Sequence, residues 1–298
     1  MSPRRALGRR RRKAAAAVDE QPVLMQIRGP DLGRRHAIDG ERLLLGSGAG
    51  AGLRLELEAV EPEHAEIERL GGQVVLRDRR SRGGTYVNDR RIDELELEHG
   101  DRVQLGRALL RFFCQDVVAA CDGEQRRLAG EDGLTGLYNR RAFRDQLAAE
   151  LSRCQRYGRE LSLFIYGPDE AGRLERMLGP VVLDALLVEL VELVGQFLSR
   201  DDFHARYGEQ EFAVILPEVN QAQALMQAER IRRAVEGTEL QPHGQPVPVT
   251  ISVGVATFER DMEDAADFIA EIDRNLYQST KAGRNRVIGV EGGVTRCS

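Results

Sequence analysis

The stretch Arg206-Tyr207-Gly208-Glu209-Gln210-Glu211-Phe212 joins two apolar segments in the second half of the chain. Residues 203–207 run into it and residues 212–216 follow it. Two short segments of this kind, separated by a polar turn that contains glycine, predict a β-hairpin. The second half of the chain is therefore expected to contain a sheet in which this hairpin is central.

Helical and strand patterns alternate on both sides of the hairpin from residue 132 onwards. Two helices for each face of a sheet, with a hairpin at its centre, predict a ferredoxin-like α+β layer. The expected helices cover residues 139–158, 181–198, 222–235 and 265–281, and the further strands cover residues 161–166, 247–256 and 286–290.

The first half of the chain has a different pattern. Residues 23–113 contain short apolar or alternating segments about every ten residues, separated by glycine pairs and charged turns. This spacing is typical of an all-β sandwich of antiparallel strands. The expected order is a basic disordered arm (1–21), a β-sandwich (22–114), a helical connector (115–131), the α+β domain (132–291) and a tail (292–298).

Charge is distributed unevenly along the 298 residues, whose net charge is −5. Seven Lys and Arg residues lie within Arg4–Lys13, and without them 36 basic residues face 48 acidic ones, a net charge of −12. The arm is either a solvated tail or a segment that touches nucleic acid, anionic lipid or an acidic partner. The acidic remainder argues against a main nucleic-acid surface elsewhere.

The sequence contains neither a membrane-spanning apolar segment nor a cysteine pattern typical of zinc sites or disulfides. No window approaches the roughly 18 consecutive apolar residues of a membrane span. The four cysteines lie far apart without a C-x-x-C spacing, so neither a zinc site nor a disulfide framework is expected. Together these features indicate a cytoplasmic location.

The first domain carries an ordered series of motifs that resembles the forkhead-associated (FHA) family of phosphothreonine-binding β-sandwiches. Three positions depart from the residues with which that family holds the phosphate: Ser47 replaces an Arg, Glu61 a Ser and Gly83 an Asn. Phosphate recognition needs guanidinium and hydroxyl donors, so we expect an intact sandwich with a degenerate phosphopeptide site. The motifs are Glu63-His64-Ala65-Glu66-Ile67, Ser81-Arg82-Gly83-Gly84-Thr85-Tyr86-Val87-Asn88 and Asp101-Arg102-Val103-Gln104-Leu105-Gly106.

The second domain resembles the GGDEF family, the diguanylate cyclases that join two GTP molecules into cyclic di-GMP. The family's reaction uses divalent ions held between carboxylates and triphosphate. The resemblance rests on the hairpin together with Asp132-Gly133-Leu134-Thr135-Gly136-Leu137-Tyr138-Asn139-Arg140-Arg141, Val249-Thr250-Ile251-Ser252-Val253-Gly254-Val255-Ala256 and Gly283-Arg284-Asn285-Arg286-Val287.

Several catalytic positions of that family are altered. Gly167 stands where the family has a metal-binding Asp, and Asp169 is two residues further along. In the hairpin, Glu209 replaces the second Gly and Gln210 replaces an acid, while Glu211 retains one. Because several charges that act together are missing, we expect a non-enzyme with no metal and no cofactor, in which Asp169 and Glu211 are catalytic remnants. Mg²⁺ is expected only if the domain is an active cyclase.

The nucleotide-binding positions are partly retained. Asp184 matches a base-reading Asp and Arg284 a phosphate-binding Arg, whereas Glu175 replaces the base-reading Asn and Thr280 a Lys. The family's inhibitory site for cyclic di-GMP has the pattern Arg-x-x-Asp, and residues 199–202 keep its Asp as Asp202 with Arg200 one position late.

Three functions follow as hypotheses. The first is a catalytically inactive scaffold that binds protein partners in a bacterial pathway related to cyclic di-GMP. The second is a cyclic di-GMP effector that uses Arg200 and Asp202, and the third is an active cyclase that uses Asp169 and Glu211. The connector helix is expected either to pair in a homodimer or to act as a rigid spacer.

Overall fold

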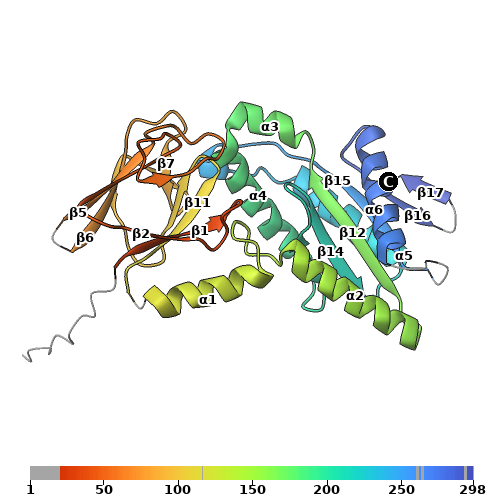
Figure 1. The fold of residues 1–298 in the computed structure, drawn as a ribbon. Coiled ribbons are helices and arrows are strands. Elements are labelled where there is room, and N and C mark those ends of the chain that lie inside the picture. Colours follow the sequence, from red (N-terminus) through yellow and green to blue (C-terminus); the bar gives the residue numbers. More distant parts are fainter. Residues whose placement is uncertain are drawn as a thin grey trace, which may run out of the picture.

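The computed structural model describes residues 21–297, apart from residues 71, 116, 260, 261, 263, 264, 292 and 293. The basic arm Arg4–Lys13 lies outside these described residues. A β-sandwich and an α+β domain lie side by side, and helix α1 (Val117–Gly130) runs below the sandwich toward the second domain (Figure 1). Two domains of the predicted fold classes are thus confirmed.

The sandwich consists of two sheets whose facing sides form one apolar core. One sheet has the order β2-β1-β11-β10-β7-β8 and the other β4-β3-β5-β6-β9. Leu24, Leu45, Ile67 and Phe112 are fully buried between them. The strands are β1 (Val23–Arg28), β2 (Arg35–Ala37), β3 (Arg42–Gly46), β4 (Leu53–Arg54), β5 (Ala65–Leu70), β6 (Gln73–Asp78), β7 (Thr85–Val87), β8 (Arg90–Ile92), β9 (Glu94–Glu96), β10 (Arg102–Leu105) and β11 (Ala108–Phe113).

Helix α1 packs against the outer side of the sandwich. Its residues Val117, Cys121 and Leu128 are buried in a cluster with side chains of β1 and β11. Glu124 is also buried on this side, where it forms ion pairs with Arg111 of β11 (3.3 Å) and with Arg127 (2.8 Å). The apolar side of the connector is therefore covered by the protein's own sheet.

The second domain is built on one mixed sheet of order β13-β14-β12-β15-β16-β17. Strand β12 pairs antiparallel with β14 and with β15, and β15 pairs parallel with β16 through the crossover helix α6. The strands are β12 (Leu161–Pro168), β13 (Phe203–Arg206), β14 (Phe212–Pro217), β15 (Ile251–Thr257), β16 (Val287–Glu291) and β17 (Val294–Cys297), the last of which lies in the segment expected to be a tail.

Helices cover both faces of this sheet, which explains why β12 is an almost continuous apolar run. Side chains of α4 and α5 form the core on one face, and those of α2 and α6 form the core on the other. This arrangement confirms the predicted ferredoxin-like α+β layer, but the β13–β14 hairpin lies at one edge of the sheet and not at its centre, as was expected. The helices are α2 (Arg140–Tyr157), α3 (Ala171–Leu178), α4 (Pro180–Gly195), α5 (Gln221–Glu236) and α6 (Ala265–Lys281), with a 3₁₀ turn at Pro242–Gly244.

The two domains pack directly against each other. The backbone at Gly133 approaches β1 so closely that a Cβ there would lie 1.9 Å from the carbonyl oxygen of Ile27. Leu134 is buried in the same cluster as β1, β11 and α1. At another point of the contact, the rings of Tyr86 and His243 lie 5.1 Å apart. The contact therefore combines backbone, apolar and aromatic groups.

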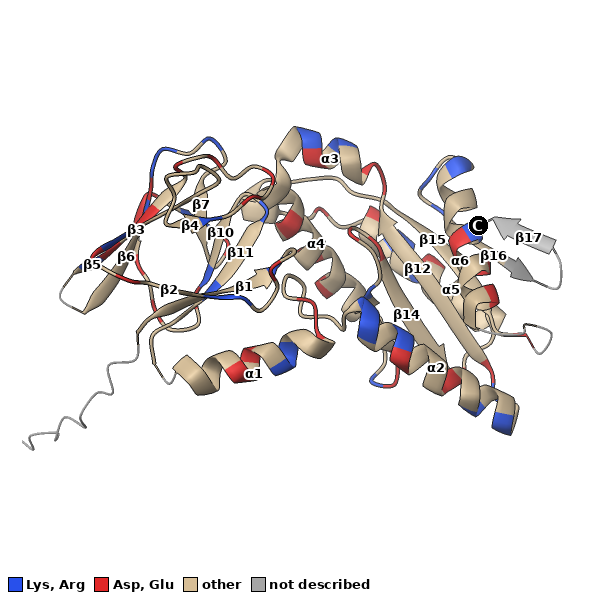
Figure 2. Cartoon of the chain, in the orientation of Figure 1, with Lys and Arg blue, Asp and Glu red and all other residues tan. Residues whose placement is uncertain are grey.

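Charged residues of both signs are interspersed over the structure, as α2 illustrates (Figure 2). No helix in the described part of the chain is long and apolar enough to cross a membrane.

Candidate functional site

A cavity of about 370 Å³ lies between the end of β12 and the turn of the β13–β14 hairpin. Its lining includes Asp169 and Glu211, so the structure brings the two predicted catalytic remnants to one place. The carboxylate of Asp169 is already engaged, because it accepts hydrogen bonds from the hydroxyls of Thr250 and Ser252, each at 2.6 Å. The backbone N–H of Asn285 donates to it as well, at 2.9 Å.

Glu211 is positioned by the hairpin turn. The backbone N–H groups of Tyr207 and Gly208 both donate to its carbonyl oxygen at 2.9 Å, which directs the side chain of Glu211 back toward Gly208. Burial and then the negative charge of Asp273 raise the pKa of Glu211, although Arg140 opposes this shift. This carboxyl is therefore more easily protonated than an exposed glutamate.

The carboxylates in this arrangement do not fit the divalent ions that the family resemblance implies. Among the described residues, no group of three or more His, Cys, Asp and Glu side chains is arranged to hold a metal ion. Gly167 has no carboxylate to offer at the end of β12. The carboxylate oxygens of Asp169 already accept hydrogen bonds from Thr250, Ser252 and Asn285.

Asp184 lies on α4 at the contact between the domains and is only 3% exposed. Its carboxylate forms an ion pair with Arg28 of β1 and accepts a hydrogen bond of 2.9 Å from Gln104 of β10. Burial raises the pKa of Asp184, and the nearby Arg28 guanidinium opposes that shift. The residue to which the family resemblance assigns base reading thus has side chains of the sandwich as its partners.

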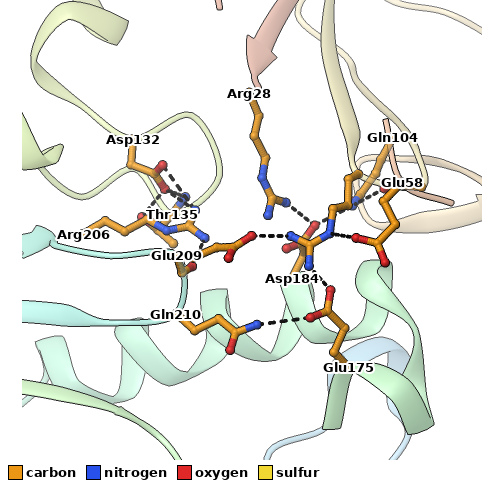
Figure 3. A network of polar contacts seen from close by, with 12 residues as sticks. Arg28, Glu58, Gln104, Asp132, Thr135, Glu175, Asp184, Arg206, Glu209 and Gln210 are labelled. Atoms are coloured by element: carbon orange, nitrogen blue, oxygen red, sulfur yellow. Dashed lines mark hydrogen bonds and ion pairs between the residues drawn. The ribbon is translucent and has the colours of Figure 1, made fainter. Parts of the chain in front are cut away.

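A second polar network at this contact includes Glu58, Glu175 and Glu209, which are labelled in Figure 3, and Arg107 is the partner that all three share. It lies in the short turn between β10 and β11, and its guanidinium forms ion pairs with three carboxylates. Nη1 lies 2.9 Å from Glu209 of the hairpin turn, Nε lies 3.1 Å from Glu58 of the sandwich, and Nη2 contacts Glu175 of α3. Burial lowers the pKa of Arg107, but the carboxylates outweigh this effect and raise it overall.

The remaining nucleotide-site residues have partners of their own. Arg284 forms an ion pair of 2.9 Å with Glu170, which follows β12, and does not contact Asp184. Arg200 and Asp202 line a separate cavity of about 810 Å³ at the other end of the sheet. In that cavity, Asp202 accepts a hydrogen bond of 2.8 Å from the backbone N–H of Ser199.

The predicted phosphopeptide positions hold the loops of the sandwich to one another. The Ser47 hydroxyl donates to the carbonyl oxygen of Val60 at 2.9 Å. The backbone N–H of Ser47 donates to the carbonyl oxygen of Glu61, also at 2.9 Å. The Glu61 carboxylate accepts from the backbone N–H of Arg82, at 2.8 Å, directly before Gly83. Loss of phosphopeptide binding at these loops stays a prediction.

Three residues of the site were not identified from the sequence: Arg28, Gln104 and Arg107. All three belong to the sandwich, and Arg107 is 68 and 102 positions away from its partners Glu175 and Glu209. A signal was nevertheless present, because two carboxylates replace neutral residues at positions that the family resemblance places beside a nucleotide. Such a pair points to a cation supplied by another part of the chain.

Comparison with known proteins identifies both domains. A family model described as "Diguanylate cyclase, GGDEF domain" matches residues 129–286, and an FHA domain model matches residues 43–106. Diguanylate cyclase DgcP of Pseudomonas aeruginosa is 33% identical over 164 residues, which are 55% of this chain and 24% of that protein. Response regulator PleD of Caulobacter vibrioides is 31% identical over 208 residues, 68% of this chain and 45% of that protein. The chain thus spans less than half the length of either relative.

Solved structures agree with this assignment. The GGDEF domain of DgcB from Caulobacter crescentus, in complex with c-di-GMP, has 29% identity and a TM-score of 0.52, and the match covers 54% of this chain and 95% of that one. Diguanylate cyclase SiaD of Pseudomonas aeruginosa, in complex with its activator SiaC, has 26% identity and a TM-score of 0.52 over 59% of this chain and 67% of that one.

These matches contradict the expectation that the second domain is not an enzyme. Several of the relatives are named diguanylate cyclases, at about 30% identity. The expectation followed from the combined loss of residues at positions such as Gly167, Glu209 and Gln210.

Proposed function

Because the chain belongs to the diguanylate cyclase (GGDEF) family, we propose that it acts in cyclic di-GMP signalling as a nucleotide-binding protein controlled by a protein partner. In this proposal, the FHA-like domain covers the nucleotide face of the GGDEF domain, and a partner that draws it away gives GTP access. No resident cofactor is assigned to the closed arrangement.

One observation carries the proposal, namely the occupation of Asp184 by Arg28 and Gln104. A carboxylate that reads a base must offer its oxygens to N–H donors of that base. In the closed arrangement, by which we mean the sandwich packed on the GGDEF domain as in this structure, the guanidinium of Arg28 and the amide of Gln104 already bind the carboxylate of Asp184. The complex of the relative SiaD with its activator SiaC supports control by a protein partner.

The test is a titration of the full chain with a fluorescent GTP analogue, in parallel with an Arg28→Ala, Gln104→Ala double variant. We expect the variant to bind at least tenfold more tightly, because a buried Asp184 without partners favours separation of the domains, after which it can accept from the base. Formation of cyclic di-GMP from GTP is measured in the same samples, and an added Glu211→Gln change is expected to abolish it. Absence of GTP binding in both proteins would contradict the proposal.

A second candidate function is the binding of cyclic di-GMP in the cavity of about 810 Å³ beside Ser199–Asp202. Three guanidinium groups, those of Arg153, Arg159 and Arg200, line this cavity together with five carboxylates. Arg153 and Arg159 form ion pairs with Glu150 and Glu218, so phosphate groups of the ligand would have to replace these carboxylates, and Arg200 is the guanidinium on which the candidate rests. The DgcB complex with c-di-GMP supports the candidate. Calorimetric titration of the full chain is expected to give saturable heat that an Arg200→Ala variant loses, and no heat at about 100 µM ligand would contradict it.

A further inference from the structure

Two acidic residues that replace neutral ones in the GGDEF domain lie in the same network. Glu175 of α3 and Glu209 of the hairpin turn both form ion pairs with Arg107 (Figure 3). Gln210, the third altered residue of this region, donates to Glu175 at 3.4 Å. A common partner in the sandwich thus gives the two acidic replacements one physical explanation.

Arg107 is suited to hold these carboxylates together. Its side chain is only 18% exposed, and Glu175 is 20% exposed, so this pair is partly withdrawn from water. Glu58 and Glu209 are both 72% exposed, so their ion pairs with Arg107 are screened by solvent and contribute less. Without Arg107, three carboxylates would face one another with no cation between them, which is unfavourable.

The turn that carries Arg107 is itself held firmly in the sandwich. The backbone N–H of Arg107 donates to the carbonyl oxygen of Glu58 at 3.0 Å, and the turn continues directly into the paired strands β10 and β11. The guanidinium therefore projects from a rigid support, and its position relative to Glu175 and Glu209 depends on how the two domains sit against each other.

We infer that Arg107 is a clasp: its guanidinium binds Glu175 and Glu209, locks the FHA-like domain on the nucleotide face, and excludes a nucleoside triphosphate while it is there. The inference rests on the proposed function for the identity of the excluded ligand. The clasp itself is a contact between domains and is tested without any nucleotide.

Hydrogen exchange of the full chain tests the contact. An Arg107→Glu variant places a fourth carboxylate in the network, and we expect amides in residues 104–110, 172–178 and 206–211 to exchange at least tenfold faster. Combining it with Glu175→Arg and Glu209→Arg restores opposite charges, and exchange should return to within about threefold of the original chain. Arg79→Ala is the matched control, because Arg79 pairs with Glu63 and Glu66 inside the sandwich, each at 3.1 Å.

Two results would overturn the clasp. One is unchanged exchange at these segments in Arg107→Glu. The other is faster exchange throughout the sandwich that the charge swap does not reverse, since Arg107 would then support the sandwich and not the contact.

Measurements of GTP-analogue binding distinguish a failure of the clasp from a failure of the proposed function. A Glu175→Asn, Glu209→Gly variant removes two acceptors of Arg107 together with their charges, and it should bind the GTP analogue at least tenfold more tightly than the original chain. Arg107→Ala keeps both carboxylates, which repel a triphosphate, so its gain should be smaller. If the domains separate but no variant binds GTP, the proposed function fails and the clasp stands. Equal GTP binding by the original chain and all variants would refute the exclusion and the control of access by the sandwich, and only nucleotide binding itself would stand.

Discussion

Asp132 and Arg206 form an ion pair of 3.0 Å across 74 positions of sequence. It joins the segment that opens the second domain to the first strand of the hairpin. The Thr135 hydroxyl also donates to Asp132, at 2.7 Å, and Arg206 also donates to the carbonyl oxygen of Glu209, at 2.6 Å. Arg206 thus links the hairpin turn, through Glu209, to the segment that opens the second domain, through Asp132.

An Asp132→Asn variant is expected to lower the free energy of unfolding by about 3 kcal/mol, because it leaves the buried Arg206 without its carboxylate. Denaturant unfolding at pH 7 measures this loss. Asp201→Asn, in an exposed loop, is the control and should change stability by less than about 0.5 kcal/mol.

The same pair gives a pH dependence. Burial alone would raise the pKa of Asp132, but Arg206 and the hydrogen bonds from Thr135 lower it overall. Because the folded value lies below the unfolded one, the stabilisation is present above the ordinary Asp pKa and is lost as the pH falls through the folded value. The difference between the original chain and Asp132→Asn should therefore shrink below about pH 4. A difference that stays constant down to pH 2 would contradict this assignment.

His204 predicts a second pH effect. It is buried, it pairs with the Tyr166 hydroxyl at 2.8 Å, and burial lowers its pKa to about 4. The unfolded chain takes up a proton at this residue below about pH 6.5 while the folded one does not, so stability falls as the pH drops from 6.5 to 4, by up to about 3 kcal/mol. Urea unfolding at pH 7.5 and pH 5 should show a smaller loss in a His204→Gln variant. Equal losses in both proteins would show that His204 is not the cause.

Gly254 of β15 is required by its contact with α6. A Cβ there would lie 2.4 Å from the backbone nitrogen of Leu276 and 2.7 Å from the carbonyl oxygen of Ile272. Both atoms belong to a helix backbone, so Gly254→Ala should lower the midpoint of thermal unfolding, with a cost of about 1–3 kcal/mol. Gly123→Ala, in α1 with open space around it, should instead stabilise by about 0.5–1 kcal/mol. A Gly254→Ala variant as stable as the original chain would show that α6 moves aside freely.

Local patterns were enough to predict most of the fold. The hairpin was predicted because its two strands and its turn are adjacent in sequence. Helix α3 was not predicted, since it has only eight residues and begins after Glu170, whose φ of +56° gives no sequence signal. Strand β15 begins at Ile251 and not at Val247, because Val247 forms an isolated bridge with Leu240 and is buried in the core without continuing the ladder.

The site was harder to predict for a physical reason. Alignment to a family places Asp169 and Glu211 near each other, because Asp169 directly follows β12 and Glu211 directly precedes β14, its antiparallel neighbour. No pattern of spacing reveals that Arg107 reaches Glu175 and Glu209, since the pairing depends on how two separately folded domains dock. The acidic replacements were recognised from the sequence, and only the structure showed the cation they meet.

The burial of Asp184 has a consequence for how the two domains can move. If the sandwich withdrew only slightly, Arg28 and Gln104 would lose the carboxylate before water could reach it, and a buried unpaired charge is strongly unfavourable. Intermediate separations should therefore be poorly populated. The two domains should behave as a two-state system, either fully packed against each other or fully separated. A partner that separates them would therefore change the fraction of separated molecules, with no partly open state in between.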